Sequence, residues 1–97
     1  MTFGDALEAL KAGKKVTRAG WNGKGMYLWL KQGITITADM CHDPTLKELA
    51  IENGGEIVGL PTICAFTHDS CGYKAVQTGW LASQSDILLD DWEVVNE

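Results

Sequence analysis

The sequence has few cysteines, no long apolar run and fewer basic than acidic residues, and each shortage excludes a class of protein. Cys41, Cys64 and Cys71 are odd in number and include no Cys-x-x-Cys pair, which argues against a disulfide scaffold and for a reducing compartment. No apolar run approaches the roughly 20 residues of a membrane-spanning helix, and the N-terminus lacks the pattern of a secretory signal. We therefore expect a cytoplasmic protein that binds no membrane.

Basic residues are scarce overall, with 8 against 13 acidic ones and a net charge of −5. An acidic protein is a poor candidate for DNA or RNA, whose binding depends on many phosphate contacts at once. Six of the basic residues, however, lie within residues 1–31. That basic N-terminal third is still able to hold one or two phosphates of a small ligand.

Metal and catalytic chemistry also lack their usual patterns. Ligand-type side chains occur at Cys41, His42, Cys64, His68 and Cys71, without the spacing of a zinc site. A Cys/His pair is conceivable from His68 with Cys64 or Cys71, but no spacing favours it. The carboxylates Asp90, Asp91 and Glu93 have no evident acid or base partner. We expect no metal, no cofactor and no catalytic residue, and therefore a protein that is not an enzyme.

The chain is rich in tryptophan and glycine for its length. Its 97 residues, 45% of them apolar, suffice for a single domain, and they include four tryptophans and eleven glycines. Tryptophan buries the most surface per residue and is also a favoured stacking platform and interface anchor. The surplus fits either a packed core or a binding surface.

Local patterns predict an α+β fold, a small domain with a mostly antiparallel sheet, an N-terminal helix and one or two further short helices. Thr2 and Asp5 form a capping box for the first helix, and Asp43-Pro44 begins the second. The predicted helices cover residues 2–12 and 44–53, with a further helix start at 83–86. The predicted strands are 15–18, 26–30, 34–37, 60–67, 73–77 and 92–95, with turns at 20–25, 31–33 and 68–72.

The turn Trp21-Asn22-Gly23-Lys24-Gly25-Met26 is the first candidate binding segment. Its glycines expose backbone N–H groups to an anion, Trp21 offers a flat apolar face, and Lys24 adds a charge. These parts suit a base, a ribose and a phosphate, although the spacing matches neither a P-loop nor a dinucleotide fingerprint. The alternative is a tight hairpin whose Trp21 packs on the core.

The run Gly79-Trp80-Leu81-Ala82-Ser83-Gln84-Ser85-Asp86 is the second candidate. Its hydroxyl, amide and carboxylate groups could read ribose hydroxyls or base edges. The alternative is that these residues are ordinary helix caps and that Asp86 stabilises the helix dipole.

Residues 1–16, these two segments and Asp90-Asp91-Trp92-Glu93-Val94-Val95 together resemble the second class of phage Thoeris anti-defence proteins. The resemblance implies a sponge that sequesters a cyclic ADP-ribose isomer made by a TIR enzyme, without cleaving it. It also implies a homo-oligomer, commonly a tetramer, with ligand sites between subunits. Residues 38–60 match no part of the pattern and are expected to be a variable insertion.

Carried over position by position, the resemblance assigns ligand binding to two sets of residues. They are Trp21, Asn22, Lys24 and Met26 in the first segment, and Trp80, Ala82, Ser83, Gln84 and Asp86 in the second. The alternatives are a sponge for the cyclic di- or trinucleotides of CBASS-type defence, a nucleotide-processing enzyme, and a structural protein whose tryptophans serve only assembly.

Overall fold

The computed structural model describes residues 1–21 and 25–96, which form two compact units. The first unit contains Met1–Lys31 and Thr62–Glu97, and the second contains Gln32–Pro61. Each unit has its own antiparallel sheet. The α+β architecture predicted from the sequence, a small fold with three α-helices and mostly antiparallel strands, is confirmed.

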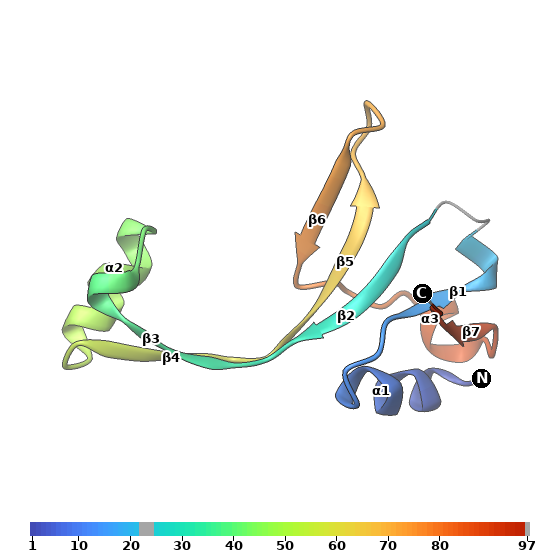
Figure 1. Cartoon of the computed structure of the whole chain (residues 1–97), viewed down its shortest axis with the longest axis horizontal. Helices are drawn as coiled ribbons and strands as arrows, with labels where there is room; N and C mark the ends of the chain where they lie inside the picture. The colour runs from blue at the N-terminus through green and yellow to red at the C-terminus, as the bar shows by residue number, and fades with distance from the viewer. Residues whose placement is uncertain (22–24, 97) are drawn as a thin grey trace. The chain divides into compact units, whose positions relative to one another are not determined.

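The first unit is built on a five-stranded sheet in the order β6-β5-β2-β1-β7 (Figure 1), in which every neighbouring pair is antiparallel. The strands are β1 (Val16–Arg18), β2 (Tyr27–Lys31), β5 (Thr62–His68), β6 (Lys74–Thr78) and β7 (Trp92–Val94). At one end of the β2–β5 ladder Lys31 lies opposite Thr62. The two connections to the second unit therefore leave the sheet side by side.

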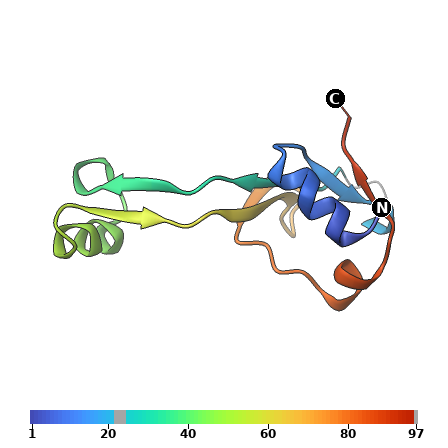
Figure 2. The same cartoon turned by 90° about the horizontal axis from the view of Figure 1, so that it is seen from below.

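Helix α1 (Phe3–Lys11) covers one face of this sheet, beside β1, β2 and β7 (Figures 1 and 2). The predicted capping box is present, since Thr2 Oγ1 accepts from the Asp5 N–H and the Asp5 carboxylate accepts from the Thr2 N–H. The apolar side of the helix meets the sheet in a core made of Ala6, Leu10, Val16, Leu28, Ala65 and Trp92. Burial of this stripe is what holds a nine-residue helix in place.

Strand residues alternate between the two faces of the sheet. Val16 and Leu28 point into the core, so their neighbours Thr17 and Tyr27 belong to the opposite face. On that face the ring of Tyr27 contacts those of Trp29 and Phe66, at centroid distances of 6.0 and 5.2 Å. The face under α1 thus forms the buried core, Trp92 included, and Tyr27, Trp29 and Phe66 form an aromatic cluster on the other face of the sheet.

The second unit is a hairpin of β3 (Ile34–Thr37) and β4 (Glu56–Gly59) with α2 (Pro44–Glu52) between the two strands in sequence (Figure 2). A 3₁₀ turn, η2 (Ala38–Met40), follows β3. Asp43 caps α2 by accepting from the backbone N–H groups of Thr45 and Leu46, as the Asp-Pro start predicted. Whether residues 38–60 vary among relatives stays a prediction.

Two elements differ from the prediction for the middle of the chain. Strand β4 was not predicted, because Ile57 and Val58 are only two β-branched residues soon after Gly54-Gly55, too short a run to indicate a strand without its pairing to β3. The strand predicted from residue 60 begins at Thr62, since Pro61 has no N–H to donate to a ladder. Among the described residues, no helix combines the length and apolar character that a membrane span requires.

Trp92 anchors the core, and its truncation gives a direct test of this packing. The side chain is 2% exposed and its indole N–H donates to the Asp86 carbonyl at 2.8 Å. Trp92→Ala should lower the free energy of unfolding by about 3–5 kcal/mol, measured by urea denaturation. Leu81→Ala, at a side chain 88% exposed, should stay within about 0.5 kcal/mol. Equal losses in the two variants would contradict the assigned core.

Candidate functional site

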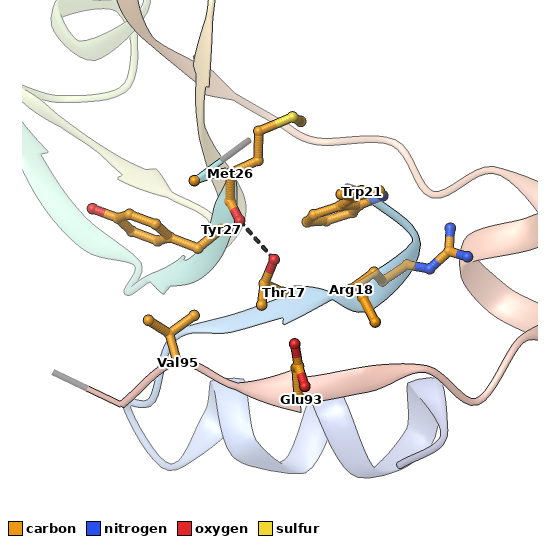
Figure 3. A pocket seen from close by; sticks show the side chains of 9 residues that line it. Thr17, Arg18, Trp21, Met26, Tyr27, Glu93 and Val95 are labelled. Atoms are coloured by element: carbon orange, nitrogen blue, oxygen red, sulfur yellow. Dashed lines mark hydrogen bonds between the residues drawn. The ribbon is translucent and has the colours of Figure 1, made fainter. Parts of the chain in front are cut away.

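A cavity of about 460 Å³ lies in the first unit where β1, β2 and β7 meet. Its walls come from Thr17, Arg18, Ala19, Trp21, Gly25, Met26, Tyr27, Glu93 and Val95. Figure 3 shows Trp21 and Tyr27 on opposite sides, with Thr17 between them and Glu93 and Val95 below. The volume lies within the roughly 300–1,000 Å³ typical of small-molecule sites.

The backbone that forms the rim of this cavity is tied to the sheet. Thr17 Oγ1 donates to the Met26 carbonyl at 2.7 Å, a bond drawn in Figure 3. Gly25 has φ +71°, a conformation that side chains disfavour, so glycine is needed where the chain turns into β2. Met26 is therefore held beside the cavity by both the turn and β1.

Trp21 is supported from behind by other aromatic rings. It ends the short 3₁₀ turn η1 (Ala19–Trp21) and contacts Trp92 and Trp80 edge to face, with centroids 5.4 and 6.3 Å away. Trp80 and Trp92 also contact each other and the ring of Phe3. Edge-to-face pairs of this kind add about 0.5–1.5 kcal/mol each beyond area burial. The indole of Trp21 is consequently both a core contact and a cavity wall.

Arg18 links the cavity to the second candidate segment. Its guanidinium donates from Nη1 to Asp86 Oδ1 at 2.7 Å, and from Nε and Nη2 to the Asp91 carboxylate at 2.8 and 3.3 Å. Arg18 is 8% exposed, so the charge is almost fully removed from water and depends on these two carboxylates. In Figure 3 the guanidinium points away from the cavity.

Asp86 combines this ion pair with a helix cap. Its carboxylate accepts from the Ser83 N–H at 2.9 Å, and Ser83 Oγ accepts from the Asp86 N–H, which starts α3 (Gln84–Leu88). Burial opposes ionisation of Asp86, but the hydrogen bonds from Ser83 and Arg18 outweigh it and lower the pKa of the carboxyl. The predicted capping role of Ser83 and Asp86 is therefore present.

Asp91 fixes the turn that carries Trp21. The Gly20 N–H donates to Asp91 Oδ2 at 2.9 Å, while Arg18 holds the same carboxylate and lowers its pKa. A Cβ at position 20 would lie 2.8 Å from Asp91 Oδ2 and 3.2 Å from Arg18 Nη2, so only glycine fits. An unbroken path of hydrogen bonds thus runs from α3 through Arg18 and Asp91 to the backbone preceding Trp21.

The structure brings part of the predicted residue set together. Trp21 and Met26 line the cavity, Trp80 packs behind Trp21, and Asp86 binds Arg18. Ala82 is half-buried, whereas Ser83 and Gln84 are exposed, and none of the three lines this cavity. Asn22 and Lys24 lie outside the described residues. Contact of any of these residues with a ligand stays a prediction.

Sequence reasoning missed the contributions of the strands themselves. Thr17 and Tyr27 line the cavity because they alternate with core residues, and Glu93 and Val95 do so from the neighbouring β7 edge. Arg18 carried a usable signal, since it is the only arginine in the sequence. A lone arginine in a predicted strand, with acidic residues elsewhere in a small domain, points to a buried ion pair.

The cysteine and histidine alternatives gain no support from the fold. Cys64 is fully buried within β5, and His68 lies four residues further along the same strand, roughly 13 Å away. That separation rules out a hydrogen-bonded dyad between them. Within residues 1–21 and 25–96, no three metal-ligating side chains cluster.

The Arg18 network makes the stability of the fold sensitive to acid. Both carboxyl groups have lowered pKa values in the folded protein. Their stabilisation is therefore present above the unfolded value of about 3.9 and is lost as the pH falls through the lower folded values. The free energy of unfolding should decline below about pH 4, and Asp91→Asn should lower it at pH 7 but flatten the decline.

Urea denaturation between pH 7 and pH 2 measures this effect. Asp90→Asn is the matched control, since the Asp90 side chain is exposed and only its carbonyl accepts from the N-terminal ammonium. It should leave stability at pH 7 within about 0.5 kcal/mol. Parallel pH curves for the unsubstituted protein and Asp91→Asn would refute a stabilising role for the ion pair.

Comparison with known proteins agrees with the resemblance seen in the two segments. A family model described as the Thoeris anti-defense 2-like domain matches residues 1–95. The chain is also similar to Thoeris anti-defense 2 of Bacillus phage SP01, with 33% identity over 96 residues, spanning 99% of this chain and 96% of that relative. Both matches extend across the sheet unit and the hairpin unit. The chain belongs to the Thoeris anti-defense 2-like family.

Proposed function

We propose that this protein counters Thoeris defence as a sponge, binding and retaining a cyclic ADP-ribose isomer made by a TIR enzyme without cleaving it. Family membership supports the anti-Thoeris role. The observation that carries the sponge mechanism is the aromatic-walled cavity beside Trp21 and Tyr27. The proposed place of action is the cytoplasm of the infected cell.

The lining of the cavity suits a nucleotide-like ligand. Trp21 and Tyr27 present flat apolar faces on which a purine can stack, and stacking contributes about 1–3 kcal/mol per base. Thr17 and Glu93 are polar groups suited to bonding ribose hydroxyls. Predominantly apolar walls with a few oriented polar groups are the usual composition of a cofactor-sized site.

Tight binding of a scarce signal is favoured when the side chains of the cavity are already fixed before the ligand binds. The Asp86–Arg18–Asp91–Gly20 path fixes the backbone before Trp21, and the rings of Trp80 and Trp92 fix its indole. A preorganised site spends less free energy on immobilising side chains, and more remains as affinity. This rigidity favours a sponge over a weak, adaptable binder.

Binding without turnover is consistent with the groups available. Among the described residues that line the cavity, Glu93 is the only carboxylate, and the guanidinium of Arg18 is engaged by Asp86 and Asp91. Hydrolysis of a glycosidic or phosphate bond ordinarily needs an acid and a base on either side of that bond. The described lining thus offers stacking walls and hydrogen-bonding groups, but one carboxylate where hydrolysis ordinarily uses an acid and a base.

We further propose that the active form is a homotetramer whose subunits together close the ligand sites. Large apolar side chains are exposed on the first unit, notably Tyr73, Leu81 and Leu88 at 73–88%. Exposed apolar surface of this kind is typical of association sites. Sedimentation or light scattering, with and without ligand, measures the subunit number.

Direct binding tests the sponge. Calorimetry with cyclic ADP-ribose isomers should give a stoichiometric complex, and heating the washed complex should release the ligand intact, identified by mass spectrometry. Cyclic di- and trinucleotides are the comparison ligands and test the CBASS alternative. Absence of binding to any cyclic ADP-ribose isomer would sink the proposal, and recovery of linear ADP-ribose alone would indicate an enzyme.

Truncation of Trp21 tests whether the cavity is the site. Trp21→Ala should weaken binding by about 5- to 150-fold, the equivalent of one lost stacking contact. Trp29→Phe is the control, because Trp29 is also half-buried and does not line the cavity, and phenylalanine keeps an aromatic ring beside Tyr27. Subunit number must be measured alongside, so that a lost oligomer is not mistaken for a lost contact. Equal affinities for Trp21→Ala and the unsubstituted protein would place the ligand elsewhere.

A further inference from the structure

A second cavity, of about 360 Å³, adjoins the first where α1 ends and β1 begins. Its lining residues are Gly13, Lys14, Lys15, Val94, Val95 and Asn96. Val95 lines both cavities, so the two lie next to each other beside β7, the outer strand of the sheet. The composition differs sharply, because the second cavity has two lysines and a side-chain amide in place of aromatic walls.

Lys15 places a positive charge at the boundary between the two cavities. Its Nζ lies 4.9 Å from the centroid of the Tyr27 ring, and Tyr27 is a wall of the first cavity. The Val95 N–H donates to the Lys15 carbonyl, so the β1–β7 pairing extends to this residue. Two residues along the chain, Thr17 shares the same face of β1 and lines the first cavity. The Lys15 ammonium therefore lies over a ring that forms a wall of the first cavity.

The electrostatics of the second cavity favour an anion. Among its described lining residues there are two cations and no carboxylate. The nearby C-terminal end of α1 carries partial negative charge, which opposes an anion. Two of its carbonyls, however, already accept hydrogen bonds, those of Leu10 and Ala9 from the N–H groups of Gly13 and Lys14. Lys14 and Lys15 are the charged residues among the described ones that line this cavity.

We propose that this second cavity is a phosphate subsite, in which Lys14, Lys15 and the Asn96 amide bind the pyrophosphate of a ligand whose base occupies the aromatic cavity. The inference rests on the proposed function and names the part of the site that reads a diphosphate. Ammonium and amide N–H groups are donors suited to phosphate oxygens, and two cations match the charge of a pyrophosphate bridge. The subsite would thereby select diphosphate-linked nucleotides over nucleosides.

Inorganic pyrophosphate is the probe that tests the subsite independently of the sponge. In a ¹⁵N-labelled sample of the whole chain, titration should shift the backbone resonances of Lys14, Lys15 and Asn96. The doubly substituted Lys14→Gln/Lys15→Gln protein should lose these shifts, whereas Lys11→Gln, on the exposed side of α1, should keep them. If pyrophosphate does not shift the resonances of Lys14, Lys15 and Asn96 in the unsubstituted protein, the inference is wrong, regardless of the result for the variants.

Cyclic ADP-ribose and adenosine provide the second arm. The double variant should bind cyclic ADP-ribose at least about tenfold more weakly, with a smaller dependence of Kd on salt, while its affinity for adenosine stays unchanged. Undiminished binding of cyclic ADP-ribose by the double variant would overturn the subsite and leave the sponge standing. Pyrophosphate shifts without any binding of cyclic ADP-ribose would retain the subsite and refute the sponge.

Discussion

Arg18 and its two carboxylates are the interaction on which the cavity depends, because they join three segments that are far apart in the sequence. Asp86 belongs to the cap of α3, Asp91 precedes β7, and Gly20 precedes Trp21. A guanidinium removed from water is costly unless its donors are satisfied, so the three segments are constrained to a single arrangement. The position of the Trp21 wall is thus fixed by a guanidinium that points away from the cavity.

Trp21 shows that one side chain can be both a core contact and a cavity wall. One edge of the indole meets Trp80 and Trp92, while another part lines the cavity with Tyr27. The two interpretations of the glycine-rich turn drawn from the sequence are therefore compatible, and the packing is what would make the stacking face rigid. The same holds for Asp86, which is both a helix cap and an arginine partner.

Local signals in the sequence sufficed for most of the fold. Thr2 with Asp5, Asp43 with Pro44, and Ser83 with Asp86 mark helix starts through contacts three residues apart or fewer, which a reader of the sequence can identify. Strand β4 was not predicted, because it is recognisable as a strand only from its pairing with β3. The cavity escaped in the same way, since Thr17, Glu93 and Tyr27 are neighbours only through the register of the sheet.

The pairing of Lys31 with Thr62 means that the first unit closes on itself before the second unit begins. The thirty residues from Gln32 to Pro61 connect the end of β2 to the start of β5, which are paired neighbours in the sheet. A two-residue hairpin turn would suffice for this connection. The ladder, the core and both cavities of the first unit use none of them. A change in the length or sequence of this segment would therefore leave the core and both cavities of the first unit with the same described residues.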